Sequence, residues 1–345
     1  RVSVSLIDNH SKKKKQDVED ILDKYEGKLK RRKFLFVRIM VLYCISIYLF
    51  LLVFGLVVLT RLNVQSDTFN MQKIADGIYV HTGFHHEGLH DIANIGFIVG
   101  EESIAVIDTG SSLAIGDSLK KAIRSVSSLP VRYVINTHIH PDHFFGNSAF
   151  EKDDPIFIGH ENLSMAFQSN GTFYLARMEE ELGKGAVTGR EFQIDVTPVA
   201  TGKPLSIDLG NRALTITAYP HSHSSTDITI FDAKTKTLWL SDLLFIDRVP
   251  ALIGGGTISG WIEVSEDLKQ IDAALVVPGH GPASASWPKA IDPQIEYLKV
   301  IRRDIRKIIA EGGSINDAVG KAGQSQRNKW KLFGDVNGGN VTGAF

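Results

Sequence analysis

Three histidines and an aspartate fall within six positions of the sequence. The stretch "NTHIHPDHFFGN" contains His138, His140, Asp142 and His143. In an extended segment residues two apart point the same way, so His138 and His140 can face one ion. Pro141 favours an extended conformation before it and suits the first turn of a helix, which turns Asp142 and His143 toward a neighbouring position. The spacing predicts a metal-binding loop that can serve two ions, rather than a solvated polar turn.

Several apolar, β-rich runs each end at a further potential ligand. "VRYVIN" leads into His138, "LTITAYP" into His221 and His223, "TLWLS" into Asp242, "ALVVPG" into His280 and "SIAVI" into Asp108. In layered α/β folds reactive groups collect where strands end, because the sheet fixes the backbone there. We therefore expect these residues to meet at one edge of a sheet. His221 and His223 compete for one ligand place, and spacing alone leaves that choice open.

The elements that must position these residues are strands alternating with helices. The runs that predict strands are residues 77–83, 94–100, 103–110, 131–138, 214–223, 227–242 and 273–281. Helical spacing predicts a helix over 112–126 capped by Ser112, one or two helices over 161–185 broken at Gly171, and an amphipathic helix ending at Gly312. A helix is also expected to begin at Asp142.

Other polar residues have more ordinary interpretations. We expect Asp108 to orient the histidine loop through hydrogen bonds rather than to bind metal itself. His85, His86 and His90 lie in the polar stretch "GFHHEGLHDIAN", and this loop is expected to overhang the site and shape its pocket. The favoured interpretation of the three histidines is a polar loop, and a contact with substrate is the alternative. Isolated histidines such as His81 and His160 are interpreted as hydrogen-bonded polar groups without a role at the site.

Composition limits the class of protein. At 345 residues and 43% apolar content, the chain suits one packed domain with an appendage. Residues 1–61 carry 13 Lys and Arg against 6 Asp and Glu, and the remainder carries 25 against 33, so the globular part argues against a nucleic-acid partner. The single cysteine, Cys44, excludes an intrachain disulfide and a cysteine-based zinc cluster. Histidine and carboxylate must therefore hold any metal.

The appendage contains a candidate membrane anchor. Ile39–Thr60 is a run of 22 residues without a charge, long enough to cross a hydrocarbon core as a helix. Its amino-terminal flank is rich in lysine and arginine, so the positive-inside rule places that side in the cytoplasm and everything after Arg61 in the periplasm or outside the cell. We expect the basic flank to enforce this topology, with binding to anionic lipid as the alternative.

A cleavable signal peptide is the rival interpretation of the same run. Its apolar region is normally about 7 to 15 residues long and ends at small residues. The sequence "LTRLNVQSD" offers no such site, which favours an uncleaved anchor. Met40 is an alternative start, and a chain beginning there would lack most of the basic flank.

The ordered set of motifs resembles the metallo-beta-lactamase fold superfamily. "HIHPDH" matches its H-x-H-x-D-H signature, His223 stands four residues before Asp227 as in its H-T-x-x-D element, and "SD" at Asp242 and "PGHG" at His280 follow in the same order. The resemblance covers residues 72–290. More narrowly, "DTG", "NTHIHPDHFFGN", "TLWLSDLLF" and "VVPGHGP" are similar to the quinoprotein relay system zinc metallohydrolases, from which the histidine-rich "HHEGLHDIAN" and the basic extension depart.

This resemblance implies a fold and a ligand set. The fold is α/β (α+β), a four-layer αβ/βα sandwich with the metals at one edge. The implied ligands of the first zinc ion are His138, His140 and His223, those of the second are Asp142, His143 and His280, and Asp242 bridges the two. The pattern thus favours His223 over His221. The same residues also suit iron or manganese.

The implied activity is hydrolysis. Two such ions bring the pKa of a shared water from about 15.7 to near neutrality and polarise a carbonyl oxygen. The resemblance implies a metal-bridging hydroxide that attacks a small ester, thioester, amide or lactam, with Asp142 and Asp242 as the catalytic carboxylates. Aspartate at position 242 is more similar to glyoxalase II than to the beta-lactamases that place cysteine there, which disfavours beta-lactamase as the main role.

The alternative is a redox accessory protein. Such a protein would hold iron or zinc, hydrolyse nothing, and serve a periplasmic quinoprotein dehydrogenase system. The domain organisation expected in either case is a basic cytoplasmic segment (1–38), the anchor (39–60), a linker (61–71), the metallo-beta-lactamase-fold domain (72–290) and a C-terminal helical extension (291–345).

Overall fold

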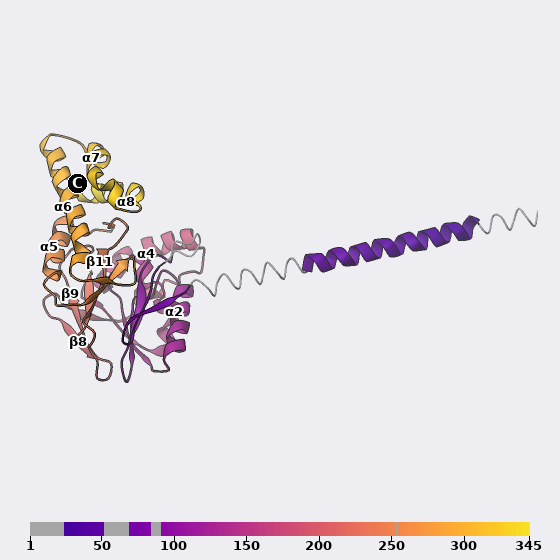
Figure 1. The fold of residues 1–345 in the computed structure, drawn as a ribbon, viewed down its shortest axis with the longest axis horizontal. Helices are drawn as coiled ribbons and strands as arrows, with labels where there is room; N and C mark the ends of the chain where they lie inside the picture. The colour runs from indigo at the N-terminus through magenta and orange to yellow at the C-terminus, as the bar shows by residue number, and fades with distance from the viewer. Residues whose placement is uncertain (1–23, 52–68, 84–90, 253) are drawn as a thin grey trace, which may run out of the picture. The chain divides into compact units, whose positions relative to one another are not determined.

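The chain divides into two compact units, Arg1–Thr68 and Phe69–Phe345. The structure is a computed structural model that describes residues 24–51, 69–83, 91–252 and 254–345. In the first unit the described part is one helix, Lys24–Leu51, of 28 residues, long and apolar enough to cross a membrane (Figure 1). A signal sequence near an amino terminus meets the same criterion. Of the expected anchor, residues 39–51 lie in this helix and residues 52–60 lie outside the described residues.

The second unit is built on two sheets. The described part of the first sheet has seven strands in sequence order: β1 Met71–Ala75, β2 Ile78–His81, β3 Ile95–Val99, β4 Ile104–Ile107, β5 Val131–Ile135, β6 Ile156–His160 and β7 Val196–Val199. The second has six, in the order β13-β12-β11-β10-β9-β8: β8 Leu205–Asp208, β9 Ala213–Ala218, β10 Ile228–Asp232, β11 Thr237–Phe245, β12 Leu275–His280 and β13 Ala285–Ser286. The pairs from β4 to β7 and the pair β11–β12 are parallel. Parallel strands bring their carboxyl ends to one edge.

Helices cover the outer faces of both sheets. They are α2 Leu113–Val126, α3 Pro141–Phe144, α4 Leu163–Leu182, α5 Ile258–Leu268, α6 Asp292–Ala310, α7 Ile315–Lys321 and α8 Phe333–Ala344. Five short 3-10 turns join them: η1 Asn147–Ala149, η2 Glu151–Asp153, η3 Arg190–Gln193, η4 Lys289–Ile291 and η5 Gln324–Lys329. The C-terminal helices α6, α7 and α8 follow the last strand (Figure 1).

Three apolar interfaces stack these elements into four layers. Leu119 of α2 packs with Val106 on the outer face of the first sheet. Ile135 and Ile216 belong to the cluster between the two sheets. Trp261 of α5 packs with α6, β11 and β12 on the far side of the second sheet. Figure 1 shows α2 and α5 on opposite outer faces. The predicted four-layer αβ/βα sandwich is therefore confirmed.

A buried ion pair ties the two sheets together. Arg212, before β9, bonds Asp232 at the end of β10, with 2.8 Å between Nη2 and Oδ2, and both side chains are at most 2% exposed. The same guanidinium donates to the carbonyl oxygens of Val99 and Asp76 in the first sheet and its β1–β2 turn. All four groups are satisfied, which is the condition for a buried charge to be tolerated.

Two helix predictions are corrected. The predicted break at Gly171 is wrong, because α4 continues through it. A Cβ on Gly171 would lie 3.0 Å from the ring of Phe192, so this glycine makes room for an aromatic ring rather than ending the helix. The helix expected from Asp142 is only α3, four residues long, followed by η1. The predicted cap at Ser112 is confirmed by its hydrogen bond from the Ile115 N–H, and α6 ends at Ala310, two residues before Gly312.

Candidate metal centre

Seven histidine and aspartate side chains converge where strands of both sheets end. Strand β5 leads into the loop of His138, His140, Asp142 and His143, β9 leads toward His223, and β11 and β12 carry Asp242 and His280. All seven are buried, and their ligand atoms form two groups in which every atom lies within 4.8 Å of the others. The first is His138, His140, His223 and Asp242, and the second is Asp142, His143 and His280. The structure thus brings together all seven residues named as ligands from the sequence.

The facing atoms suit a cation. His138 Nε2, His143 Nε2, His223 Nε2 and Asp242 Oδ1 are buried without a hydrogen-bond partner in the described chain. Buried polar atoms left unpaired are costly unless something else satisfies them. Two ligands of a tetrahedral ion at about 2.0–2.1 Å stand about 3.3 Å apart, and the histidine Nε2 atoms lie 3.2 to 3.6 Å from Asp242 oxygens. The residues therefore fit divalent metal ions.

The Asp242 carboxylate lies between the two groups. Its Oδ2 is 3.6 Å from His138 Nε2 and 3.5 Å from His223 Nε2. Its Oδ1 is 3.2 Å from His143 Nε2 and 3.3 Å from His280 Nε2. One oxygen faces each group, so Asp242 stands where a bridging carboxylate must stand.

A second set of contacts orients the imidazoles. His143 Nδ1 is 2.8 Å from Asp108 Oδ2, His223 Nδ1 is 3.1 Å from Asp227 Oδ1, and His280 Nδ1 is 2.7 Å from the Ile92 carbonyl oxygen. When Nδ1 donates in this way, the lone pair of Nε2 faces the cluster, which is the usual arrangement of a metal-binding histidine.

Asp108 is placed behind the ligand loop and outside both groups. Its Oδ1 accepts the Thr137 backbone N–H at 2.8 Å, and its Oδ2 accepts the Thr137 hydroxyl at 2.6 Å as well as His143 Nδ1. Asp108 and Ser241 both adopt positive φ, 54° and 48°, and Ser241 Oγ lies 2.8 Å from the Thr137 hydroxyl. Such strained backbone conformations concentrate at functional sites.

The protonation states follow from burial and charge. Burial lowers the pKa of His138 well below its ordinary value, and it lowers the pKa of His140 to about 4. Burial acts the same way on His143, but the carboxylate of Asp242 and two further aspartates outweigh it and raise the pKa of His143 well above its ordinary value. Burial raises the pKa of Asp242, yet the surrounding histidines hold it well below the usual range. His138 and His140 are thus neutral imidazoles, each able to offer a nitrogen lone pair to a metal ion. The Asp242 carboxylate is ionised.

The other histidines in the described part of the chain lie outside the two groups. His221 is exposed and contacts the Gly255 carbonyl oxygen, so the structure brings His223 and not His221 into the cluster. His85, His86 and His90 lie outside the described residues. His81 bonds Asp91 at 2.8 Å and His160 lies 3.0 Å from the Tyr219 carbonyl oxygen, as expected of hydrogen-bonded polar groups.

Three residues near the site were missed in the sequence. Gly279, before His280, lies against Asp242, and a Cβ there would overlap the carboxylate. Gly254 and Tyr174 come together beside His140. Gly279 could have been recognised from the "PG" of the motif "PGHG". No local pattern marks Tyr174, because its neighbours come from distant parts of the chain.

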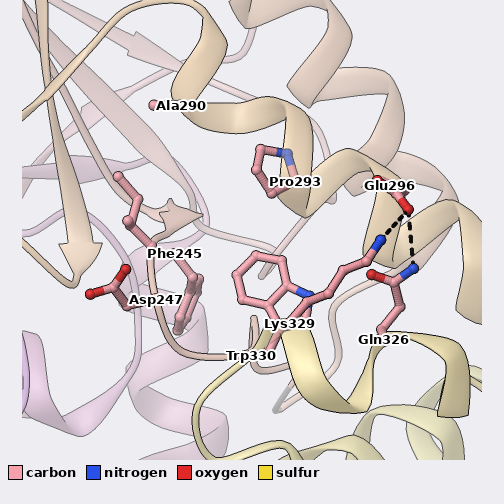
Figure 2. A pocket seen from close by; sticks show the side chains of 9 residues that line it. Phe245, Asp247, Ala290, Pro293, Glu296, Gln326, Lys329 and Trp330 are labelled. Carbon is pink, nitrogen blue, oxygen red and sulfur yellow. Dashed lines mark hydrogen bonds and ion pairs between the residues drawn. The ribbon is translucent and has the colours of Figure 1, made fainter.

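A cavity of about 200 Å³ lies next to the centre but is not part of it. Phe245 lines it, and its ring stacks on His280 with centroids 4.8 Å apart. Figure 2 shows Phe245 and Trp330 at the cavity and the Glu296 carboxylate bonded to Lys329 and Gln326. None of the seven clustered residues lines this cavity.

Comparisons with known proteins agree with this architecture. Among solved structures, a metallo-beta-lactamase from Pontibacter korlensis superposes with a TM-score of 0.54 at 19% identity, over 67% of this chain and 99% of that one. The metallo-beta-lactamase IND-7 superposes with a TM-score of 0.53 at 20% identity, over 68% of this chain and 99% of that one. A double mutant of the sec-alkyl sulfatase PisA1 superposes with a TM-score of 0.56 at 14% identity, over 73% of this chain and 45% of that one. At these identities the likeness shows the fold alone.

Sequence comparison gives a relative and a family. A "linear primary-alkylsulfatase" from Pseudomonas sp. (strain ATCC 19151) is 31% identical over 62 residues, which is 18% of this chain and 12% of the sulfatase. The profile of the metallo-beta-lactamase superfamily matches residues 89–280, which contain all seven clustered residues. The narrower similarity to the quinoprotein relay group stays a prediction. The chain belongs to the metallo-beta-lactamase superfamily.

Proposed function

We propose that the protein is a membrane-anchored dinuclear zinc hydrolase that cleaves a small ester, thioester, amide or lactam. The observation that carries this proposal is the Asp242 carboxylate, each of whose oxygens faces a separate group of histidines at 3.2 to 3.6 Å. Zinc is the proposed metal because imidazole nitrogen and carboxylate oxygen are its ordinary ligands in the absence of cysteine.

The residues divide the chemical work between them. Divalent ions bound at the two groups would supply Lewis acidity, which polarises a substrate oxygen and makes water acidic near neutral pH. Asp142 Oδ2 lies 3.6 Å from His143 Nε2 and 3.4 Å from His280 Nε2. The Asp142 side chain is 11% exposed against 4% for Asp242. We therefore assign the transfer of protons to and from solvent to the Asp142 carboxylate, and a fixed structural role to Asp242.

Sulfate-ester hydrolysis is a second candidate substrate class. Its support is the similarity to the linear primary-alkylsulfatase, confined to 62 residues. Beta-lactam hydrolysis is kept as a weaker candidate on the likeness of fold.

The membrane arrangement is a proposal of its own. The helix Lys24–Leu51 supports a single-pass anchor, and its basic flank favours a cytoplasmic amino terminus with the hydrolase unit in the periplasm or outside the cell. Protease added to sealed cells or right-side-out vesicles should digest residues 69–345 without lysis. Digestion only after lysis would show the opposite orientation, with residues 69–345 in the cytoplasm.

A metal assay combined with a substrate panel tests the activity. The full chain in detergent, with its metals quantified by mass spectrometry, is offered an aryl ester, a thioester, a lactam and a medium-chain alkyl sulfate. We expect zinc and turnover of one class, and the matched control His138→Ala/Asp242→Ala should lose both. Zinc without turnover on any class would refute the hydrolase proposal. Two equivalents of redox-active iron without turnover would favour the redox accessory protein, the proposed partner of a quinoprotein dehydrogenase system.

A further inference from the structure

Tyr174 of α4 has its ring buried beneath the ligand loop. The side chain is 4% exposed and belongs to an apolar cluster with Ile139 and Phe144. Ile139 stands between His138 and His140 in the chain, so this cluster supports the back of the loop that carries them. A tyrosine in this position combines an apolar body with a polar tip that needs a partner.

The tip of Tyr174 lies beside the first group. A methyl carbon built on Gly254 would lie 3.0 Å from the Tyr174 hydroxyl oxygen and 3.3 Å from His140 Nε2. The phenol oxygen and this histidine of the cluster therefore both lie close against Gly254. No group in the described ranges hydrogen-bonds to this hydroxyl.

The Tyr174 hydroxyl is also in its protonated form. Burial, and after it the carboxylate of Asp142, raise the pKa of Tyr174 above its ordinary value. The phenol is therefore neutral near neutral pH and can donate a hydrogen bond.

We propose that Tyr174 contacts substrate, and that its hydroxyl donates a hydrogen bond to a substrate oxygen bound beside His140. This inference rests on the proposed hydrolase function. The phenol donates a hydrogen bond and keeps its proton throughout. Because the oxygen gains negative charge during hydrolysis, the bond strengthens as the reaction proceeds.

Removal of the hydroxyl alone tests the contact. Tyr174→Phe is compared with Tyr133→Phe, a tyrosine 8% exposed in the cluster between the sheets and outside the cluster that contains Tyr174. A hydrogen bond to a charged acceptor is worth about a ten- to hundredfold change. We expect kcat and kcat/KM to fall by about that factor in Tyr174→Phe, with zinc content unchanged and Tyr133→Phe like the parent.

A binding measurement makes the test independent of turnover. Inorganic phosphate is titrated into the zinc-loaded full chain by calorimetry, as an oxyanion probe of the site. Tyr174→Phe should weaken phosphate binding by about tenfold or more. If the parent hydrolyses no substrate yet shows this difference, the proposed function fails and the contact stands. Equal phosphate affinity and equal kinetics in Tyr174→Phe and the parent would overturn the contact.

A pair of glycine variants tests the close approach of Tyr174 and His140 to Gly254. Gly254 and Gly255 both adopt positive φ, 68° and 97°, so alanine is strained at both, but a Cβ on Gly255 meets nothing within 4 Å. Gly254→Ala should reduce phosphate affinity and kcat/KM at least tenfold relative to Gly255→Ala. Equal losses in the two variants would contradict a role for the Tyr174 hydroxyl beside His140.

The remaining alternative is that Tyr174 only positions His140. In that case Tyr174→Phe would release zinc to a competing chelator more readily than the parent, and loss of activity would follow loss of metal. Such a result would overturn the proposal of a substrate contact.

Discussion

The backbone of Gly279 packs against the carboxylate of Asp242. A Cβ built on Gly279 would overlap Asp242 Oδ1 and would lie 2.6 Å from the Asp242 backbone nitrogen. β12, which carries Gly279, pairs in parallel with β11, which carries Asp242. The position of the Asp242 carboxylate is therefore set by the absence of a side chain on the neighbouring strand.

Gly279→Ala should displace Asp242 and release metal. We expect the bound metal to fall from two equivalents to one or fewer, and the free energy of unfolding to fall by about 1–3 kcal/mol from overpacking. Gly320→Ala, where nothing lies within 4 Å, is the control and should retain both ions. Metal analysis and urea unfolding measure the two effects, and full metal content in Gly279→Ala would show that Asp242 tolerates the shift.

Asp108→Asn should weaken metal binding through His143. The amide nitrogen would place a donor against His143 Nδ1, which now donates to Asp108 Oδ2 at 2.8 Å, and would favour the tautomer whose Nε2 carries a proton. The expected loss is about 10- to 100-fold in metal affinity. Asp154→Asn is a matched control, since Asp154 is exposed and has a similar φ of 51°. Equal affinities in the two variants, by chelator competition, would remove the orienting role.

Metal affinity should depend on pH through the histidines with raised pKa. Burial lowers the pKa of His143 and His223, but aspartates outweigh it and raise both. Each must lose its proton to bind metal, so affinity falls as pH falls through these raised values, by about tenfold per pH unit per proton released. His138 and His140, with lowered pKa, contribute no such slope near neutrality. Chelator competition from about pH 6 to pH 9 that gave a flat profile would contradict this assignment.

Arg212→Met should destabilise the fold without touching the site. It leaves Asp232 buried and unpaired, at a cost of about 3–5 kcal/mol. The double variant Arg212→Met/Asp232→Leu should recover most of that loss, because the unpaired charge is gone. Urea unfolding of the full chain provides the comparison. A loss below about 1 kcal/mol in the single variant, typical of a surface pair, would show that the pair does not couple the two sheets.

The ligand positions followed from where apolar runs end in the sequence. Runs ending at His138, Asp242 and His280 became β5, β11 and β12, because continuous apolar character marks strands buried on both faces. Spacing could not choose between His221 and His223. In the structure the His221 side chain is exposed and the His223 side chain lies in the cluster. The turn from Ser222 to Asp227, held by its hydrogen bonds, sets these two orientations.

Features made by tertiary contact were not predictable from local pattern. β6, β7 and β8 are strands of only four or five residues, too short for a local pattern to mark them, and they form because neighbouring strands pair with them. Gly171 suggested a helix end and instead receives Phe192. Tyr174 and Gly254 are eighty positions apart in the chain and meet only because α4 and the segment after β11 reach the same side of His140.

The count of metal ions per chain tests the central claim most directly. The full chain, purified without added chelator and analysed by mass spectrometry for zinc, iron and manganese, should hold two equivalents of divalent metal. Asp242→Ala should hold at most one, because the bridging carboxylate serves both groups. Two equivalents retained in His138→Ala/Asp242→Ala, or no metal in the parent after incubation with zinc, would contradict the dinuclear centre.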